Sequence, residues 1–440
     1  SLRSMFAFYS ARCDESQRTT LNEFQFLLEW PKLSEKSKRD YYAKHAWYIR
    51  TTSVRDRMVE LNQTISWVPK SIRDGRFGNW LEHNVDWAIS RERFWGTPLP
   101  VWTDGHGDFL CIGSIAELET LCGRSLGEID LHRPTVDNIV FQHPDNGREY
   151  QRVPEVIDCW FDAGCMPFAQ WGFPHQNVDR FASQFPADFI SEAIDQTRGW
   201  FYALLSISTI LFGPDGAARG DDRIPEQIFG DWPHPFRSCI VLGHILGEDG
   251  LKMSKSLKNY RSPDYIFEKE GADAMRWLFF AGQAPWTSLR FQEKAITEGQ
   301  REFLLRFWNV YSFFTIYARI DGWQPKGDLL AAPGSDLKLS ELDRWVLAEL
   351  HSAVEKVRNA LDGLDNLTAS TALNDFVDAL SNWYVRRGRD RYWSEGMNAD
   401  KEAANATLYH CLVTTTLLAA PFVPFITEHL YGALVKPRGD

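Results

Sequence analysis

Hydrophobic residues recur every three or four positions through most of the last third of the chain. Four of these residues predict one buried helical face: Phe376, Leu380, Trp383 and Tyr384. Apolar residues at i, i+4, i+7 and i+8 are typical of a helix that packs against others. Residues 321–338, rich in Gly, Pro and Asp, interrupt this pattern and indicate a long connection between helices. We therefore predict a helix bundle over residues 295–440.

Short apolar stretches alternate with helical stretches earlier in the chain, over residues 156–250. Two of them, residues 156–157 and 188–190, run directly into helices, and a third, residues 237–242, ends before a polar loop. Strands that alternate with helices indicate a parallel α/β sheet, in which ligands bind beyond the carboxyl ends of the strands. We predict an α/β architecture here, with the functional loops at that edge.

Three further segments precede this α/β region. Residues 1–44 combine a helix-like stretch with a basic run at 36–39, and they predict an amphipathic helix with a solvated charge cluster. Residues 45–100 contain strand-like pieces separated by turn residues, and we expect them to lead into the α/β domain. Residues 101–155 are rich in Gly, Asp and His, with one helical piece near 115–122, and they predict a small surface insertion.

Composition narrows the class of protein. A length of 440 residues suggests about three domains at ~150 residues each. The net charge of −11 argues against indiscriminate binding to nucleic acid, although a local basic patch still permits specific binding. Seven scattered cysteines, without a CxxC pair or a signal peptide, favour a reducing compartment and predict a cytoplasmic protein. Apolar runs such as residues 412–424 fall short of the ~18 residues that a membrane span needs, so no membrane contact is expected.

The sequence KMSKS at residues 252–256 concentrates charge on one loop. Lys252 and Lys255, flanked by Ser254 and Ser256, could hold the phosphates of a nucleoside triphosphate. Nucleotidyl and phosphoryl transfer depend mainly on such positioned positive charge. Taken alone, this pentapeptide is more often a solvated surface loop, but its position after a strand favours a site. Walker A and GxGxxG motifs are absent, as are the HExxH and CxxC zinc signatures, so the sequence argues against ordinary P-loop and Rossmann-dehydrogenase interpretations.

A second basic cluster lies in the predicted bundle. It consists of four arginines with aromatic neighbours: Arg386, Arg387, Arg389 and Arg391, beside Trp383, Tyr392 and Trp393. The arginines can neutralise a phosphate backbone, and the rings offer surfaces on which bases can stack. Arginines on an isolated helix are as often simply solvated or salt-bridged. The cluster predicts a contact with RNA.

Four longer strings accompany KMSKS: WAISRERFWGTPLP at 87–100, VIDCWFDAG at 156–164, DFISEAIDQTRGWF at 188–201 and LSNWYVRRGRDRYW at 380–393. Together with KMSKS they resemble class I aminoacyl-tRNA synthetases, and most of all the isoleucyl-tRNA synthetases, from about residue 45 onward. The resemblance implies the second half of a Rossmann-like nucleotide-binding domain, followed by an all-α anticodon-binding helix bundle. The valyl and leucyl enzymes share this plan and remain alternatives.

The resemblance also implies roles for residues of the loops. Lys255 would neutralise the phosphates of ATP, used with Mg²⁺, while the carboxylate of isoleucine attacks the α-phosphorus, and Lys252 would assist. Glu192, Asp195 and Gln196 would hold the ammonium group of the amino acid and the adenylate, because carboxylates are charge-assisted acceptors. Glu192 taken alone could be an ordinary acid that leads a helix.

Trp160 and Trp200 would wall the side-chain pocket, although each could instead be a core aromatic. An apolar wall separates isoleucine from valine by only about one methylene. Residues 251–294 would form the KMSKS loop and a region that contacts the tRNA stem, and the bundle would recognise the anticodon stem and loop of tRNA(Ile). No metal ligand is expected, since the insertion at 101–155 lacks the paired cysteines that some relatives use for zinc.

The first signature of that family, of the His-Ile-Gly-His type, does not occur ahead of these motifs. We therefore expect this chain to be a carboxyl-side portion that needs an amino-terminal half, in the same polypeptide or as a separate chain. We also expect little or no isoleucine-dependent ATP–pyrophosphate exchange by the 440 residues alone, and robust exchange would contradict that expectation. The alternative is a non-catalytic tRNA-binding module, but intact KMSKS and SEAIDQ strings favour an enzyme.

Overall fold

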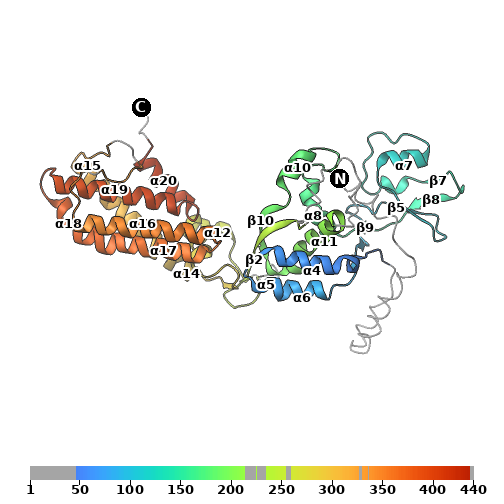
Figure 1. Ribbon diagram of the computed structural model, residues 1–440, viewed down its shortest axis with the longest axis horizontal. Coiled ribbons are helices and arrows are strands. Elements are labelled where there is room, and N and C mark those ends of the chain that lie inside the picture. The colour runs from blue at the N-terminus through green and yellow to red at the C-terminus, as the bar shows by residue number, and fades with distance from the viewer. Residues whose placement is uncertain are drawn as a thin grey trace. The chain divides into compact units, whose positions relative to one another are not determined.

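The computed structural model describes residues 46–213, 224, 234–253, 259–326, 330–334 and 336–436. The chain divides into two compact units, Ser1–Val241 and Leu242–Asp440 (Figure 1). The helix expected within residues 1–44 lies outside the described residues.

Secondary structure in the first unit consists of short strands and mostly short helices. Its strands are β1 (Tyr48–Ile49), β2 (Ser66–Val68), β3 (Trp87–Ala88), β4 (Ser90–Arg91), β5 (Val101–Thr103), β6 (Phe109–Cys111), β7 (Phe141–Gln142), β8 (Glu149–Arg152), β9 (Val156–Ile157), β10 (Ala187–Ala193) and β11 (Phe236–Leu242). Its helices are η4 (Thr51–Val54), α4 (Arg55–Thr64), α5 (Ser71–Asp74), α6 (Arg76–Glu82), α7 (Ile115–Cys122), η5 (Val136–Asn138), α8 (Cys159–Gly164), α9 (Met166–Ala169), α10 (Val178–Gln184), η6 (Ile194–Arg198) and α11 (Trp200–Phe212).

A three-stranded sheet in the order β10-β11-β2 lies at the centre of the α/β part. β2 and β11 are parallel, with Trp67 opposite Cys239. The apolar residues of α4, α6 and α11 pack around Trp67, and nearly every residue of α11 is buried. The predicted α/β architecture is confirmed, and the helices η6 and α11 follow the strand expected at 188–190.

One expected strand joins a different sheet. β9 pairs antiparallel with β4, with Ser90 opposite Ile157, and the described structure does not place it in the parallel sheet. The reason is its length, because only two residues are extended before Asp158 caps the next helix.

The residues of the predicted insertion build a small sheet of their own. β6, β5, β8 and β7 form a four-stranded antiparallel sheet with its own core, in which Trp102, Phe141 and Tyr150 are buried. α7 spans the helical piece expected near 115–122. Its N-cap is Ser114, whose side chain accepts from the backbone N–H of Glu117 at 3.0 Å.

The second unit is mainly helical. It contains β12 (Ile245–Leu246), α12 (Pro263–Lys269), α13 (Ala272–Ala281), β13 (Leu289–Arg290), α14 (Glu293–Gly299), η8 (Gln300–Leu304), α15 (Leu305–Ile320), α16 (Glu341–Asp362), α17 (Asn366–Asp378), η9 (Ala379–Val385), α18 (Arg386–Trp393), α19 (Ala399–Ala419) and α20 (Pro424–Leu434). The predicted bundle is confirmed, and its interruption falls between α15 and α16. Among the described residues, none of the helices combines the length and apolar character that crossing a membrane requires.

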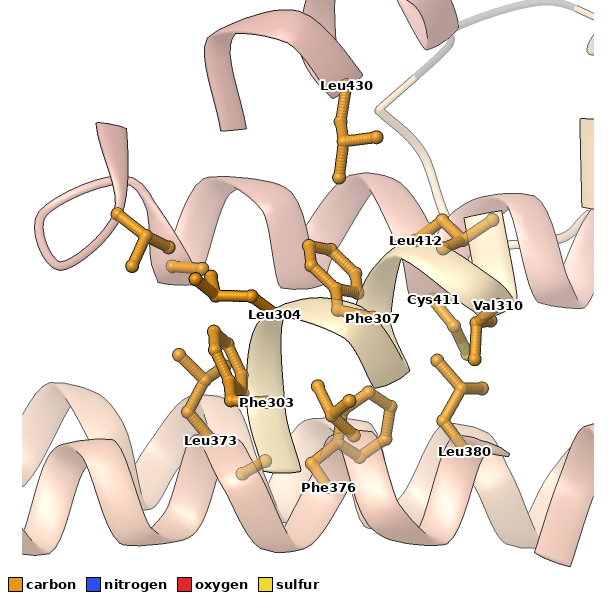
Figure 2. Close-up of a cluster of buried hydrophobic side chains, with 14 of the residues drawn as sticks. Phe303, Leu304, Phe307, Val310, Leu373, Phe376, Leu380, Cys411, Leu412 and Leu430 are labelled. Carbon is orange, nitrogen blue, oxygen red and sulfur yellow. The ribbon is translucent and has the colours of Figure 1, made fainter. Parts of the chain in front are cut away.

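Large apolar side chains from several helices fill the core of this bundle. Figure 2 shows Phe303 and Phe307, from η8 and α15, among Phe376 of α17 and residues of neighbouring helices. The start of α16 is fixed by a capping box, in which Ser340 and Asp343 each accept from the other's backbone N–H. The core and this cap hold the helices that carry the arginine cluster.

One residue of the predicted buried face points outward. Phe376, Leu380 and Tyr384 are buried, but Trp383 is 47% exposed. The cause is η9, a π-helical segment between α17 and α18. A π-helix uses more residues per turn than an α-helix, so Tyr384 rather than Trp383 returns to the face of Phe376.

Candidate functional site

The sequence SEAIDQ occupies the end of β10 and the following short helix η6 in the first unit. Glu192 lies on β10, and Asp195 lies on η6. Both side chains are exposed, and neither forms an ion pair with any residue that the structure describes. Two carboxylates in this state can accept hydrogen bonds from a cationic group of a ligand.

Gln196 and the two candidate tryptophans meet around Gly199. The backbone N–H of Trp200 donates to Oε1 of Gln196 at 2.9 Å, and the indole N–H of Trp200 donates to the carbonyl of Ala163 on α8 at 3.0 Å. A Cβ on Gly199 would lie 2.7 Å from Oε1 of Gln196 and 3.4 Å from the ring of Trp160. The structure therefore brings Trp160, Gln196 and Trp200 together, and only glycine leaves room for their approach.

The two tryptophans are not simply core residues. Trp160 remains 38% exposed, and Trp200 is half-buried although its indole is hydrogen-bonded to α8. Aromatic rings that are partly open to solvent beside a polar amide can form one wall of a small-molecule site.

Helix α8, which carries Trp160, is fixed by two buried or partly buried carboxylates. Asp158 is its N-cap and accepts from the backbone N–H of Trp160 at 3.2 Å and from the guanidinium of Arg91 at 2.5 Å. Asp162 accepts from the hydroxyl of Thr97 at 3.1 Å. Burial raises the pKa of Asp162 above its ordinary value. The hydrogen bond from Thr97 acts to lower that pKa, and the nearby negative charge of Asp158 acts to raise it. Sequence reasoning assigned none of these anchors, although all four lie inside the quoted strings 87–100 and 156–164.

The approach of α8 to α11 depends on the absence of a side chain at Gly164. A Cβ there would lie 2.7 Å from Cδ1 of Ile207 and 3.0 Å from Cβ of Ala203. We predict that Gly164→Ala lowers the free energy of unfolding of the first unit by about 1–3 kcal/mol through overpacking. Urea unfolding followed by circular dichroism measures it. Gly432→Ala, where the added Cβ meets nothing within 4 Å, is the matched control and should show no loss.

Lys252 belongs to the second unit and stands at the start of the KMSKS loop. It is exposed, and it pairs with Leu246 in an isolated antiparallel bridge. The side-chain amide of Asn259 donates to Asp249 at 3.2 Å and to the carbonyl of Lys252 at 3.4 Å, so these contacts join the two ends of the loop. The other three candidate residues of the loop lie outside the described residues: Ser254, Lys255 and Ser256.

Three of the four candidate arginines are exposed on α18, and so are the rings of Trp383 and Trp393. Tyr392, the third ring expected to stack on bases, is instead buried, and its hydroxyl donates to the carbonyl of Ala404 at 3.0 Å. Arg387 lies over the ring of Trp383, with its Cζ 3.6 Å from the ring centroid. Arg389 lies 5.8 Å from the ring centroid of Trp393, which is 54% exposed. Arg386 is also exposed. This surface offers positive charge and flat apolar rings side by side, as a single-stranded nucleic acid requires.

Arg391 is placed differently from the other three arginines. Its guanidinium donates to both carboxylate oxygens of Asp343 at 2.8 Å and also to Asp400 at 2.9 Å, and its side chain is only 14% exposed. Asp343 is fully buried and also accepts from the hydroxyl of Tyr384 at 2.6 Å. Burial favours a higher pKa for Asp343, but the hydrogen bonds from Arg391, Tyr384 and Ser340 outweigh it and hold that pKa below its ordinary value. Arg391 therefore fixes helices to one another.

No group of three or more His, Cys, Asp or Glu side chains within the described part of the chain is arranged to hold a metal ion.

Two family models match this chain. Residues 13–288 match the model of class I tRNA synthetases for isoleucine, leucine, methionine and valine, and residues 343–438 match the anticodon-binding domain of tRNA ligases. The first match contains the Gly199 site and Lys252, and the second contains the arginine cluster.

Curated relatives at high identity are isoleucine–tRNA ligases. The protein from Thermobifida fusca is 47% identical over 405 residues, with 90% of this chain and 36% of the relative covered. The protein from Deinococcus radiodurans is 49% identical over 401 residues, with 90% and 35% covered. This chain thus spans about a third of the length of these relatives.

A solved structure supports the fold at low sequence identity. The methionyl-tRNA synthetase of Mycobacterium tuberculosis, bound by methionyl-adenylate, matches with a TM-score of 0.60 and 18% identity. The match covers 90% of this chain and 64% of that one.

Proposed function

Since the chain belongs to the class I tRNA synthetases of the isoleucine, leucine, methionine and valine group, we propose that it is part of an isoleucine–tRNA ligase. The identity of 47–49% to isoleucine–tRNA ligases favours isoleucine over valine or leucine. The chain spans about a third of those relatives, so we propose the activity for a polypeptide, or a pair of chains, that also supplies the amino-terminal half.

The reaction we propose has two steps. The carboxylate of isoleucine attacks the α-phosphorus of ATP and releases pyrophosphate, and the terminal adenosine of tRNA(Ile) then takes the isoleucyl group and releases AMP. The exposed ammonium of Lys252, with Lys255, would neutralise charge on the phosphates. Mg²⁺ would enter with the phosphates of ATP, as this ion commonly does, because the described residues offer no cluster of ligands for it.

The observation that carries the amino-acid site is the gathering of Trp160, Gln196 and Trp200 around Gly199. The rings would contact the side chain of isoleucine, and the amide would contact the adenylate. The open carboxylates of Glu192 and Asp195 would accept the ammonium group of the amino acid.

The experiment that tests the proposed function is isoleucine-dependent ATP–pyrophosphate exchange, after an amino-terminal half from a relative is supplied. Exchange with isoleucine, much weaker exchange with valine and none with leucine is the expected result. Exchange that prefers valine or leucine, or no exchange by a complex shown to assemble, would contradict it.

We further propose that the cluster on α18 contacts the anticodon arm of the tRNA through Arg386, Arg387 and Arg389. Arg391 is excluded from this role, because its guanidinium is already bound to two carboxylates.

Replacing all three arginines should weaken binding of tRNA(Ile) by about tenfold or more. Each phosphate contact that is lost also lowers the slope of log affinity against log salt by about 0.7–0.9. Fluorescence anisotropy with labelled tRNA over a range of salt concentrations measures both effects. The control is R301Q/R319Q/R358Q, which removes equal charge from exposed arginines elsewhere in the second unit. Equal loss in the two variants would show that only total charge matters.

A further inference from the structure

A second pair of exposed aromatic residues lies in the first unit, on the loop after β4. Phe94 is 62% exposed and Trp95 is 66% exposed, more than any other large hydrophobic residue in the described part of that unit. Water-exposed rings of this size cost free energy unless something covers them. Nothing in the proposed amino-acid site uses them.

Both rings are held in place by residues of the insertion. Trp95 stacks on the imidazole of His132, with ring centroids 4.9 Å apart and planes inclined by 8°. The guanidinium of Arg133 lies over Phe94, 5.1 Å from its ring centroid, and Arg133 is itself oriented by Asp137 at 2.7 Å. The exposed aromatic surface is therefore an ordered platform, which we define as Phe94, Trp95, His132 and Arg133.

The loop that carries the platform is tied at both ends to α8. Before the loop, Arg91 donates to Asp158, the N-cap of α8, and after it the hydroxyl of Thr97 donates to Asp162 of the same helix. Gly96 between them has φ +156°, and a Cβ there would lie 3.1 Å from Val156. The platform is thus fixed to the helix that carries Trp160.

We propose that this platform binds the unpaired 3′ strand of the tRNA by stacking its bases. The inference rests on the proposed function, since the terminal adenosine has to reach an adenylate held beside Trp160. Flat rings are sequence-tolerant partners for unpaired bases, and the guanidiniums of Arg133 and the exposed Arg93 suit the backbone between those bases. A double-stranded stem, whose bases are already stacked, gains nothing from such a surface.

The test uses the full 440-residue chain in the R386Q/R387Q/R389Q background, which weakens the RNA contacts proposed for the second unit. The probe is a short fluorescein-labelled single-stranded RNA that ends in CCA, with the same strand paired to its complement as the second probe. Trp95→Ala should weaken binding of the unpaired strand about tenfold, because stacking on one aromatic ring accounts for about 1–3 kcal/mol per base. Trp95→Phe should retain most of the affinity, and the paired probe should bind equally weakly to all variants.

Two controls keep the test specific. Phe425→Ala removes an equally exposed ring, 67% exposed, from the second unit and should change nothing. Phe94→Ala should weaken binding in the same direction as Trp95→Ala, and thermal unfolding should show that both variants remain folded. If the thermal unfolding midpoint falls in only one of the two variants, the RNA affinity of the other variant decides the test.

Equal affinity of Trp95→Ala and the parent for the unpaired strand would overturn the proposal. So would a change in oligomeric state by sedimentation velocity without a change in RNA affinity, since the platform would then be a protein contact. The proposed function is judged separately: if the chain with intact arginines binds tRNA(Ile) no better than the triple variant, the role of α18 fails, whatever the oligonucleotide shows.

Discussion

Asp343→Ala is expected to lower the free energy of unfolding of the helical unit by about 3–5 kcal/mol. The substitution removes the buried one of the two carboxylates that pair with Arg391, whose side chain is 14% exposed, and leaves only the exposed Asp400; breaking a buried ion pair by removing one partner costs about this much. It also removes the acceptor of the Tyr384 hydroxyl and the side chain that completes the capping box with Ser340. A loss of this size is a large part of the stability of an ordinary domain.

Urea unfolding followed by circular dichroism measures this effect. Glu341→Ala, two positions earlier in the same helix and exposed, is the matched control and should change stability by less than about 0.5 kcal/mol. If Asp343→Ala costs no more than this control, the ion pair with Arg391 does not hold the bundle together.

The same carboxylate predicts a dependence of stability on pH. Its folded-state pKa lies below the ordinary value of 3.8, so its contribution is complete above that value and is lost as the pH falls through the folded-state pKa. The difference in stability between the parent and Asp343→Ala should therefore be constant near neutrality and should narrow only below about pH 4. A difference that narrows already between pH 7 and pH 5 would point to another group.

The second large effect is expected at the KMSKS loop. Replacing Lys252 and Lys255 together with alanine should lower isoleucine-dependent ATP–pyrophosphate exchange of the complemented enzyme by about 100- to 1,000-fold, because positioned charge on the phosphates is lost. The loss should lie mainly in kcat, since the charge that the lysines meet grows as pyrophosphate departs.

Lys294→Ala is the control for this pair. Its side chain is 85% exposed in the same unit, where it pairs with Glu298, and its removal should leave exchange unchanged. If the double variant catalyses exchange at the parental rate, Lys252 and Lys255 do not take part in the reaction.

The architecture was predictable because long periodic patterns fix element type. Helices α15 to α20 and the buried helix α11 repeat apolar residues often enough to be recognised without partners. The pairing of β9 was not predictable, because two extended residues carry too little pattern to choose between sheets. The outward turn of Trp383 was missed for a related reason, since periodicity assumes 3.6 residues per turn and η9 does not follow it.

The sequence motifs showed which segments form the candidate sites, but they did not show which residues within each segment are free to bind a ligand. Arg386 and Arg391 look alike in the sequence, and the partner that distinguishes Arg391 lies 48 positions away, at Asp343. The sequence also did not decide whether Trp160 lines a ligand pocket or packs in the core. The contact that distinguishes the two is with Gly199, where the lack of a side chain lets the ring of Trp160 approach. The contacts that order Trp95 likewise come from His132, in another segment.

The π-helical segment η9 accommodates about one residue more than an α-helix would use before α18. A π-helix turns through a smaller angle per residue than an α-helix, so deleting one residue within Ala379–Val385 and restoring the ordinary helical period would leave the residues that follow facing nearly as they do now. Arg387 would stay exposed and Arg391 would stay beside Asp343, whereas the same deletion inside α18 would rotate the residues after it by about 100°. Among homologous sequences, a one-residue gap within Ala379–Val385 would therefore be compatible with the same outward arginines, and a gap within Arg386–Trp393 would not.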